Sequence, residues 1–264
     1  MTETRERQVS LSRRRESESE VEVLGVRFDR LTRAAALSVM TRTFGSKRAF
    51  KVYIPNAHTL NLSCSDDRFR EVLNGADLLL NDGMGVQIAS ALAGKPFAEN
   101  MVGTDLTPQV CAEAARAGIP VFLLGGEIGM VTQAAEGLKD RIPGLRIAGV
   151  HHGYFGDRDD RAVVDEINRS GAGVLLVGLG NPIQEFWIHR NAPRLECDLC
   201  IGVGGLFHHL SGRLRRAPSW ARGLGMEWAF ILASQPHKWR RYILGNPLFL
   251  YRIAVDRLRR GRRA

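Results

Sequence analysis

The chain has 264 residues, a length that suits one large domain or a domain with an appendage. Hydrophobic residues make up 44% and charged residues 25%, which is ordinary for a globular protein and excludes wholesale disorder. No apolar run reaches the roughly 18 residues of a transmembrane helix. The N-terminus lacks the apolar stretch of a secretory signal, and four cysteines suit a reducing cytosol without disulfides.

The formal net charge of +9 is unevenly distributed along the chain. Residues 213–264 hold 13 basic and 2 acidic residues, a charge of +11, whereas residues 1–212 hold the other 24 basic and 26 acidic residues. A near-neutral body therefore carries a strongly cationic C-terminal segment. This asymmetry favours a polyanionic partner for that end of the chain, either nucleic acid or an anionic membrane surface.

Apolar runs alternate with helical spacings along most of the chain. In order, the pattern predicts a disordered tail (1–20), a strand (21–26), a helix (31–44), a strand (50–55), a helix (66–73), a strand (78–81), a helix (106–116), a strand (120–126), a helix (130–141), a strand (145–149), a helix (159–170) and two further strands (174–180 and 199–205). Strands that are apolar throughout and separated by single helices indicate a parallel sheet covered on both faces. We therefore predict a Rossmann-like, doubly wound α/β domain over residues 21–212.

Residues 213–264 have a different composition, rich in Trp, Arg and Leu, and predict a helical appendage of short amphipathic pieces. Aromatic residues interleaved with cations are typical of helices that lie in a membrane interface, so we favour a membrane surface over nucleic acid. A solvated tail or a protein partner stays open for the last residues. The residues expected to bind the membrane are Arg215, Arg216, Trp220, Arg222, Lys238, Arg240 and Arg241.

Ligands of open parallel sheets bind beyond the carboxyl ends of the strands, where this chain carries several suggestive loops. Asp82 follows an apolar strand and precedes Gly83 and Gly85, which let a substrate approach the backbone. A carboxylate there suits a general base toward a hydroxyl group. It equally suits the N-cap of a helix that starts near residue 84, and the two roles can coexist.

Two glycine loops precede helices, at Gly125-Gly126 and at Gly178-Leu-Gly180. Their backbone N–H groups could hold a phosphate, but ordinary tight turns have the same composition, and neither loop has the full dinucleotide fingerprint. Cys197 and Cys200, with the histidine pair 208–209, could indicate a metal site. Strand alternation would point the two cysteines to opposite faces, so we expect no metal.

Several motifs in order resemble one family, the bacterial WecG/TagA/CpsF glycosyltransferases (glycosyltransferase family 26), over about residues 21–250. The motifs are Asn81-Asp-Gly-Met-Gly85, Gly103-Thr-Asp105, Val121-Phe-Leu-Leu-Gly-Gly126, Gly178-Leu-Gly-Asn-Pro-Ile-Gln-Glu185, Gly202-Val-Gly-Gly205, Arg216-Ala-Pro218, Glu227-Trp228 and Arg241-Tyr242.

The resemblance implies transfer of a sugar from a UDP-sugar to an undecaprenyl-diphosphate-linked sugar, with inversion and without a metal or other cofactor. It implies that Asp82 is the general base and that Asn56 and Gln184 lie in the same pocket. It further implies a cytoplasmic enzyme, peripheral on the plasma membrane, whose appendage helps to close the site. The expected substrate-binding residues are Gly83, Gly85, Asn100, Asp105, Gly125, Gly126, Gly178, Gly180, Asn181 and Glu185.

The chain departs from the family pattern at four positions. Ile54 replaces a frequent Thr, Asn100 and Ile231 replace Arg residues, and His208 stands where many members carry Asp. These changes predict the same reaction with N-acetylmannosamine or a related hexose such as glucose in an exopolysaccharide pathway, or a weakly active paralogue that docks on membranes. A nucleotide-dependent oxidoreductase on the same sheet is the alternative outside the family, and a homo-oligomer is compatible with the sequence.

Overall fold

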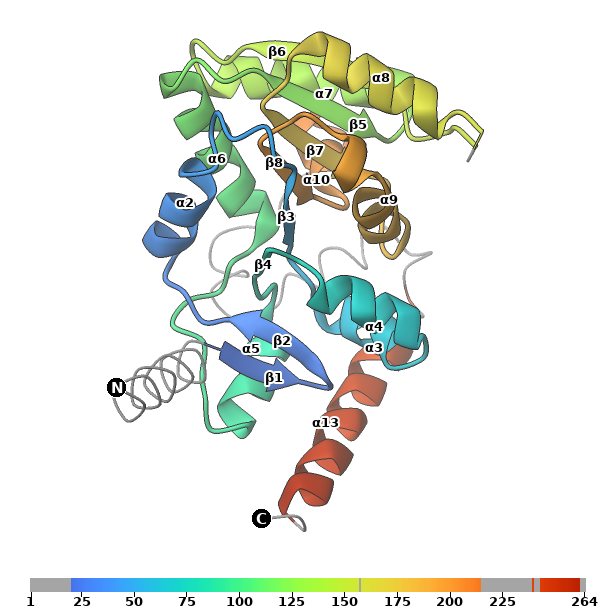
Figure 1. Ribbon diagram of the computed structural model, residues 1–264. Coiled ribbons are helices and arrows are strands. Elements are labelled where there is room, and N and C mark those ends of the chain that lie inside the picture. The colour runs from blue at the N-terminus through green and yellow to red at the C-terminus, as the bar shows by residue number, and fades with distance from the viewer. Residues whose placement is uncertain (1–19, 157, 215–238, 240–242, 262–264) are drawn as a thin grey trace, which may run out of the picture.

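The computed structural model describes residues 20–156, 158–214, 239 and 243–261 (Figure 1). Its centre is a six-stranded, wholly parallel sheet of order β4-β3-β8-β7-β5-β6. The α/β fold with a parallel sheet, predicted from the sequence, is therefore confirmed. The strands are β1 (Glu20–Val23), β2 (Val26–Asp29), β3 (Phe50–Tyr53), β4 (Leu78–Leu79), β5 (Val121–Gly125), β6 (Ile147–His151), β7 (Val174–Gly178) and β8 (Leu199–Gly202).

Helices connect the strands and cover both faces of the sheet (Figure 1). They are α2 (Arg33–Thr41), α3 (Ala57–Ser63), α4 (Asp67–Asn74), α5 (Met84–Leu92), α6 (Gly103–Arg116), α7 (Ile128–Arg141), α8 (Asp160–Ser170), α9 (Ile183–Asn191), α10 (Leu206–Leu210) and α13 (Gly245–Gly261), with a short 3₁₀ turn η1 (Ala192–Arg194). The helices α3 and α9 follow loops for which the apolar pattern predicted no separate helix.

Alternate residues of the central strands enter two different cores. In β5, Val121 and Leu123 pack with α2, α6, α7 and α10, whereas Phe122 and Leu124 pack on the other face with α4, α8 and α9. Successive side chains of a strand point to opposite faces, so a strand covered on both sides must be apolar at every position. This burial accounts for the continuous apolar runs that identified the sheet.

The prediction of one strand over residues 21–26 is wrong. The structure has a hairpin there, because Leu24 and Gly25 both take positive φ (53° and 78°) and form the tight turn between β1 and β2. The hairpin packs outside the sheet, where Phe28 meets Phe97 edge to face with ring centroids 5.6 Å apart. The carboxylate of Asp29 accepts a hydrogen bond from Leu79 N (2.8 Å), which joins the hairpin to β4.

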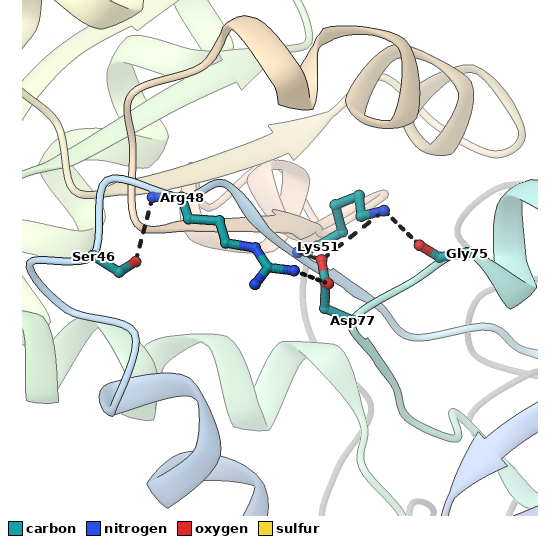
Figure 2. A network of polar contacts seen from close by, with 5 residues as sticks. All are labelled: Ser46, Arg48, Lys51, Gly75 and Asp77. Carbon is teal, nitrogen blue, oxygen red and sulfur yellow. Dashed lines mark hydrogen bonds and ion pairs between the residues drawn. The ribbon is translucent and has the colours of Figure 1, made fainter.

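A polar network joins the amino ends of β3 and β4 (Figure 2). The carboxylate of Asp77 accepts hydrogen bonds from Lys51 N (2.9 Å) and Arg48 Nη2 (3.5 Å), and Lys51 Nζ donates to the carbonyl of Gly75 (2.5 Å). These contacts fix the register of the two strands at the edge of the sheet opposite to the expected ligand loops. We therefore assign the network a structural role.

Helix α13 packs against α3 and α5. Phe249 is 1% exposed and Ile253 is 6% exposed within the same core as the hairpin. Arg252 Nη1 donates to the carbonyl and to Oδ1 of Asn61 (2.7 and 3.0 Å), which fastens the helix to α3.

Within the described segments, no helix is long and apolar enough to cross a bilayer. Residues 1–19, all seven expected membrane-binding residues and Ile231 lie outside the described residues.

Candidate functional site

The loop after β4 lies against the loop after β3, which brings Asp82 next to Asn56 along the backbone. Leu80 N donates to the carbonyl of Tyr53 (2.9 Å) and Asp82 N donates to the carbonyl of Pro55 (3.0 Å). The parallel pairing thus continues beyond the ends of both strands, as far as Pro55 and Asp82. Asp82 and Asn56, two of the expected catalytic residues, therefore lie in adjacent loops at the carboxyl edge of the sheet.

Asp82 does not cap helix α5. The N-cap is Gly83, whose φ of 87° favours glycine and which has no side chain to cap the helix. Asp82 is half-buried one position before that cap. The N-cap interpretation of Asp82 is therefore wrong, whereas its role as a base stays a prediction.

Asn56 has a clear structural role as the N-cap of α3. Its Oδ1 accepts hydrogen bonds from His58 N (3.1 Å) and Thr59 N (3.2 Å). An oxygen at the N-cap satisfies N–H groups that have no partner inside the helix. The cap also fixes where the Asn56 side chain sits beside the Asp82 loop.

Asn100 holds the loop that carries Asp82. Its Oδ1 accepts a hydrogen bond from Gly83 N (2.8 Å), and the neighbouring Met101 N donates to the carbonyl of Asn81 (3.0 Å). The side chain of Asn100 and the backbone of Met101 thus hold the loop that carries Asp82. Ile54, another of the departures, lies close to α6: its Cδ1 is 3.6 Å from the position that a Cβ on Gly103 would take.

A second polar group lies at the start of α9, where Glu185 joins two amide side chains. Glu185 Oε1 accepts hydrogen bonds from Gln184 Nε2 (2.8 Å) and from Asn181 Nδ2. Gln184 Oε1 in turn accepts from Gly204 N (2.9 Å), in the loop after β8. The side chain of Gln184 is therefore held at both ends, with its amide orientation fixed by Glu185.

Glu185 is a buried carboxyl group with an unusual environment. It is 2% exposed, and Oε2 is buried without a hydrogen-bond partner among the described atoms. Burial raises the pKa of Glu185 to about 7, although the hydrogen bonds from Gln184 and Asn181 lower it. Glu185 therefore changes its charge near neutral pH.

Tyr53 connects the loop that carries Asp82 with the polar group around Glu185. Its hydroxyl donates to the carbonyl of Glu185 (3.2 Å), and its own carbonyl receives the N–H of Leu80 in the loop that leads to Asp82. Burial raises the pKa of the Tyr53 hydroxyl, so this group stays a hydrogen-bond donor at ordinary pH. The sequence did not single out Tyr53, although its place at the end of an apolar strand was a visible signal, and it indicated Gly204 only as part of the motif at residues 202–205.

The two glycine loops lie side by side at the ends of β5 and β7. From β5 the chain continues to β6 on one side of the sheet, and from β7 it continues to β8 on the other side. The boundary between β5 and β7 is therefore the topological switch point of the sheet. Gly125 has a φ of 135°, and a Cβ there would lie 2.4 Å from the carbonyl oxygen of Gly178. Only glycine fits this contact. Gly126 and Gly180 follow in the same two loops, and Asp105 lies in the first turn of α6.

A cavity of about 440 Å³ lies between α6, α7 and α10, and its lining includes Thr104 next to Asp105. This volume falls in the range of small-molecule sites, roughly 300–1,000 Å³. His209 of α10 also lines it, whereas His208 is exposed on the same helix.

Cys197 and Cys200 lie on the same side of the sheet, with their sulfur atoms 3.2 Å apart in the core. The expectation that they point to opposite faces is wrong, because Cys197 precedes β8 and does not follow its alternation. No cluster of three or more His, Cys, Asp or Glu side chains suited to a metal ion occurs among the described residues.

A six-stranded parallel sheet covered by helices, with glycine loops at its switch point, is consistent with a Rossmann-like α/β fold. The chain belongs to the glycosyltransferase WecG/TagA/CpsF family, whose model matches residues 21–263. It is therefore a glycosyltransferase, as the resemblance in its motifs predicted.

Two curated relatives carry the name N-acetylglucosaminyldiphosphoundecaprenol N-acetyl-beta-D-mannosaminyltransferase. The protein from Bacillus spizizenii is 36% identical over 176 residues, which cover 67% of this chain and 68% of the relative. The protein from Staphylococcus aureus is 30% identical over 244 residues, which cover 91% of this chain and 94% of the relative.

Proposed function

We propose that the protein transfers a hexose from a UDP-sugar to a sugar linked through a diphosphate to undecaprenol, with inversion at the transferred carbon. The acceptor hydroxyl oxygen attacks C1 of the donor sugar while Asp82 takes the hydroxyl proton. The bond between C1 and the β-phosphate oxygen breaks, and its electron pair leaves with UDP. One carboxylate base and a stabilised leaving group are sufficient for such a direct displacement.

The position and context of Asp82 carry this proposal. It lies at the carboxyl edge of the sheet, where ligands of this fold class bind, in a loop held by Asn100 and the carbonyl of Pro55. Gly83, and not Asp82, is the N-cap residue of the helix that follows. The names of the relatives in Bacillus spizizenii and Staphylococcus aureus describe transfer to a diphosphoundecaprenol-linked sugar, which supports the same acceptor class here.

The glycine loops supply the donor side of the proposed site. Backbone N–H groups that precede a helix can bind a diphosphate, and the loops at Gly125 and Gly178 both lead into helices at the switch point. We assign the loop residues Gly126, Gly180 and Asn181 to donor binding. Gln184, fixed by Glu185 and Gly204 N, is buried beside Gly202 at the end of β8.

The cationic segment 213–264 is proposed to hold the enzyme on the cytoplasmic face of the plasma membrane. Its charge of +11 suits anionic lipid, and each basic residue near such a surface contributes about 1 kcal/mol. The names of the relatives place their acceptors on a lipid, which agrees with a peripheral location for this chain.

A screen of donors tests the proposed function. The purified protein is incubated with a diphosphate-linked N-acetylglucosamine on a lipid and, in separate reactions, with UDP-N-acetylmannosamine, UDP-glucose and other UDP-hexoses. We expect transfer from one of them with release of UDP and inversion at C1. Because Ile54 and Asn100 differ from the family pattern, the preferred sugar is expected to differ among relatives. Absence of transfer from every UDP-hexose would contradict the proposal.

A further inference from the structure

Helix α5 carries an exposed apolar stripe that begins next to the loop that carries Asp82. Met84, Ile88 and Leu92 are 49, 45 and 42% exposed, although each is a large apolar residue. They are spaced four residues apart, so they lie on one face of the helix. Met84 comes only two residues after Asp82, and the stripe runs about 12 Å from there along the helix.

The composition of α5 is unusual for a helix with a solvent-facing side. Its sequence, MGVQIASAL, contains no charged residue, so neither its packed nor its exposed face carries a charge. Val86, Ala89 and Ser90 pack toward the protein, which leaves the stripe pointing outward. A contiguous exposed apolar strip on a folded protein is typical of a binding surface.

The side of α5 that carries Gly85 packs closely against α3 and α13, which holds the helix and its stripe in place. A Cβ on Gly85 would lie 3.3 Å from the Cβ of Ala57 in α3 and 3.5 Å from Cε1 of Phe249 in α13. Both α5 and α13 lie at the end of the molecule away from α7 and α8 (Figure 1). The helix is therefore anchored, and its apolar side starts where the acceptor hydroxyl must sit if Asp82 is the base.

We propose that the stripe Met84–Ile88–Leu92 binds the first isoprene units of the polyprenyl chain of the acceptor. This inference rests on the proposed function, because it needs an acceptor whose sugar lies at Asp82. Such an acceptor continues from its sugar through the diphosphate into an apolar chain, and α5 offers an uncharged apolar path that leads away from Asp82. The stripe would thus distinguish lipid-linked acceptors from free sugar diphosphates.

The test compares two acceptors that share the same diphosphate-linked N-acetylglucosamine. One carries a full undecaprenyl chain in detergent micelles, and the other carries a short alkyl chain that is soluble in water. The variant Ile88→Gln is compared with Leu258→Gln, which replaces a residue of similar character (68% exposed) near the end of α13. We expect Ile88→Gln to raise the KM for the long-chain acceptor about tenfold. Its kcat and its KM for the short-chain acceptor should stay within about twofold of wild type. Leu258→Gln should raise the KM for the long-chain acceptor less than Ile88→Gln does.

The outcomes separate this inference from the proposed function. If the wild-type protein turns over both acceptors and Ile88→Gln keeps the wild-type preference, the stripe does not bind the chain while the proposed function stands. Equal losses in Ile88→Gln and Leu258→Gln would assign the effect to general lipid association and overturn the inference. If the unmodified chain self-associates without lipid and Ile88→Gln abolishes this, the stripe is an interface with a second copy. Absence of turnover with any acceptor overturns both proposals.

Discussion

Glu185→Gln should change how the stability of the protein depends on pH. Burial raises the pKa of Glu185 from its usual 4.5 to about 7 in the folded chain. Between these two pH values the unfolded chain releases the proton of this carboxyl group, whereas the folded chain keeps it. The stabilising contribution is therefore complete below pH 4.5 and is lost as the pH rises to about 7.

The size of this effect follows from the pKa difference. A difference of about 2.5 pH units corresponds to about 3 kcal/mol, since one unit is worth about 1.4 kcal/mol. Glutamine keeps the acceptor oxygen that Gln184 Nε2 and Asn181 Nδ2 use, but it does not ionise. The variant should therefore gain stability relative to wild type as the pH rises, by most of that 3 kcal/mol between pH 5 and pH 8.

Urea unfolding followed by circular dichroism at pH 5, 6, 7 and 8 measures this difference. Glu136→Gln, at an exposed position of α7, controls for the loss of one negative charge. Parallel curves for wild type and Glu185→Gln across the whole range would show that Glu185 ionises alike in the folded and unfolded chains. That result would refute the reasoning from its burial.

Two further pairs of variants test the architecture of the site. Gly125→Ala places a Cβ 2.4 Å from the carbonyl oxygen of Gly178 and should lower the free energy of unfolding by several kcal/mol. Its control is Gly144→Ala, where φ is also positive but no atom lies within 4 Å of the new Cβ, and where the loss should be about 1 kcal/mol. Equal losses in thermal unfolding would contradict the close approach of β5 and β7. Asn56→Ala and Asp66→Ala each remove an N-cap and should each cost about 1 kcal/mol in urea unfolding. Only Asn56→Ala should also reduce transfer, and equal activity in both variants would leave Asn56 with its cap role alone.

The sheet could be predicted from the sequence because the strands β5, β7 and β8 at its centre are buried on both faces. Runs such as 121–125 and 174–178 are apolar at successive positions, and that pattern has few explanations besides a covered parallel sheet. The hairpin at 20–29 was missed because its turn, Leu24-Gly25, interrupts an apolar run without a polar turn residue. Its position depends on contacts distant in sequence, such as Phe28 with Phe97.

The candidate site was less predictable than the fold, since its geometry depends on loops from different strands. The sequence suggested Asp82 as a helix cap as readily as a base, and the positive φ of Gly83 decided against the cap. The support of the Asp82 loop by Asn100 joins residues from separate segments, and no local pattern indicates it. The hydrogen bond from the Tyr53 hydroxyl to the Glu185 carbonyl likewise joins residues that are 132 positions apart in the sequence.

The role of Asp82 as the general base is the central claim, and Asp82→Asn tests it most directly. Asparagine has a similar shape but cannot take the acceptor proton at neutral pH, and loss of a general base typically lowers rates by about 10²–10⁴-fold. Turnover is measured with the UDP-hexose found in the donor screen, and UDP binding is measured by calorimetry. We predict a loss of turnover in that range with the Kd for UDP within about threefold of wild type. Turnover within a few fold of wild type would contradict the assignment of Asp82.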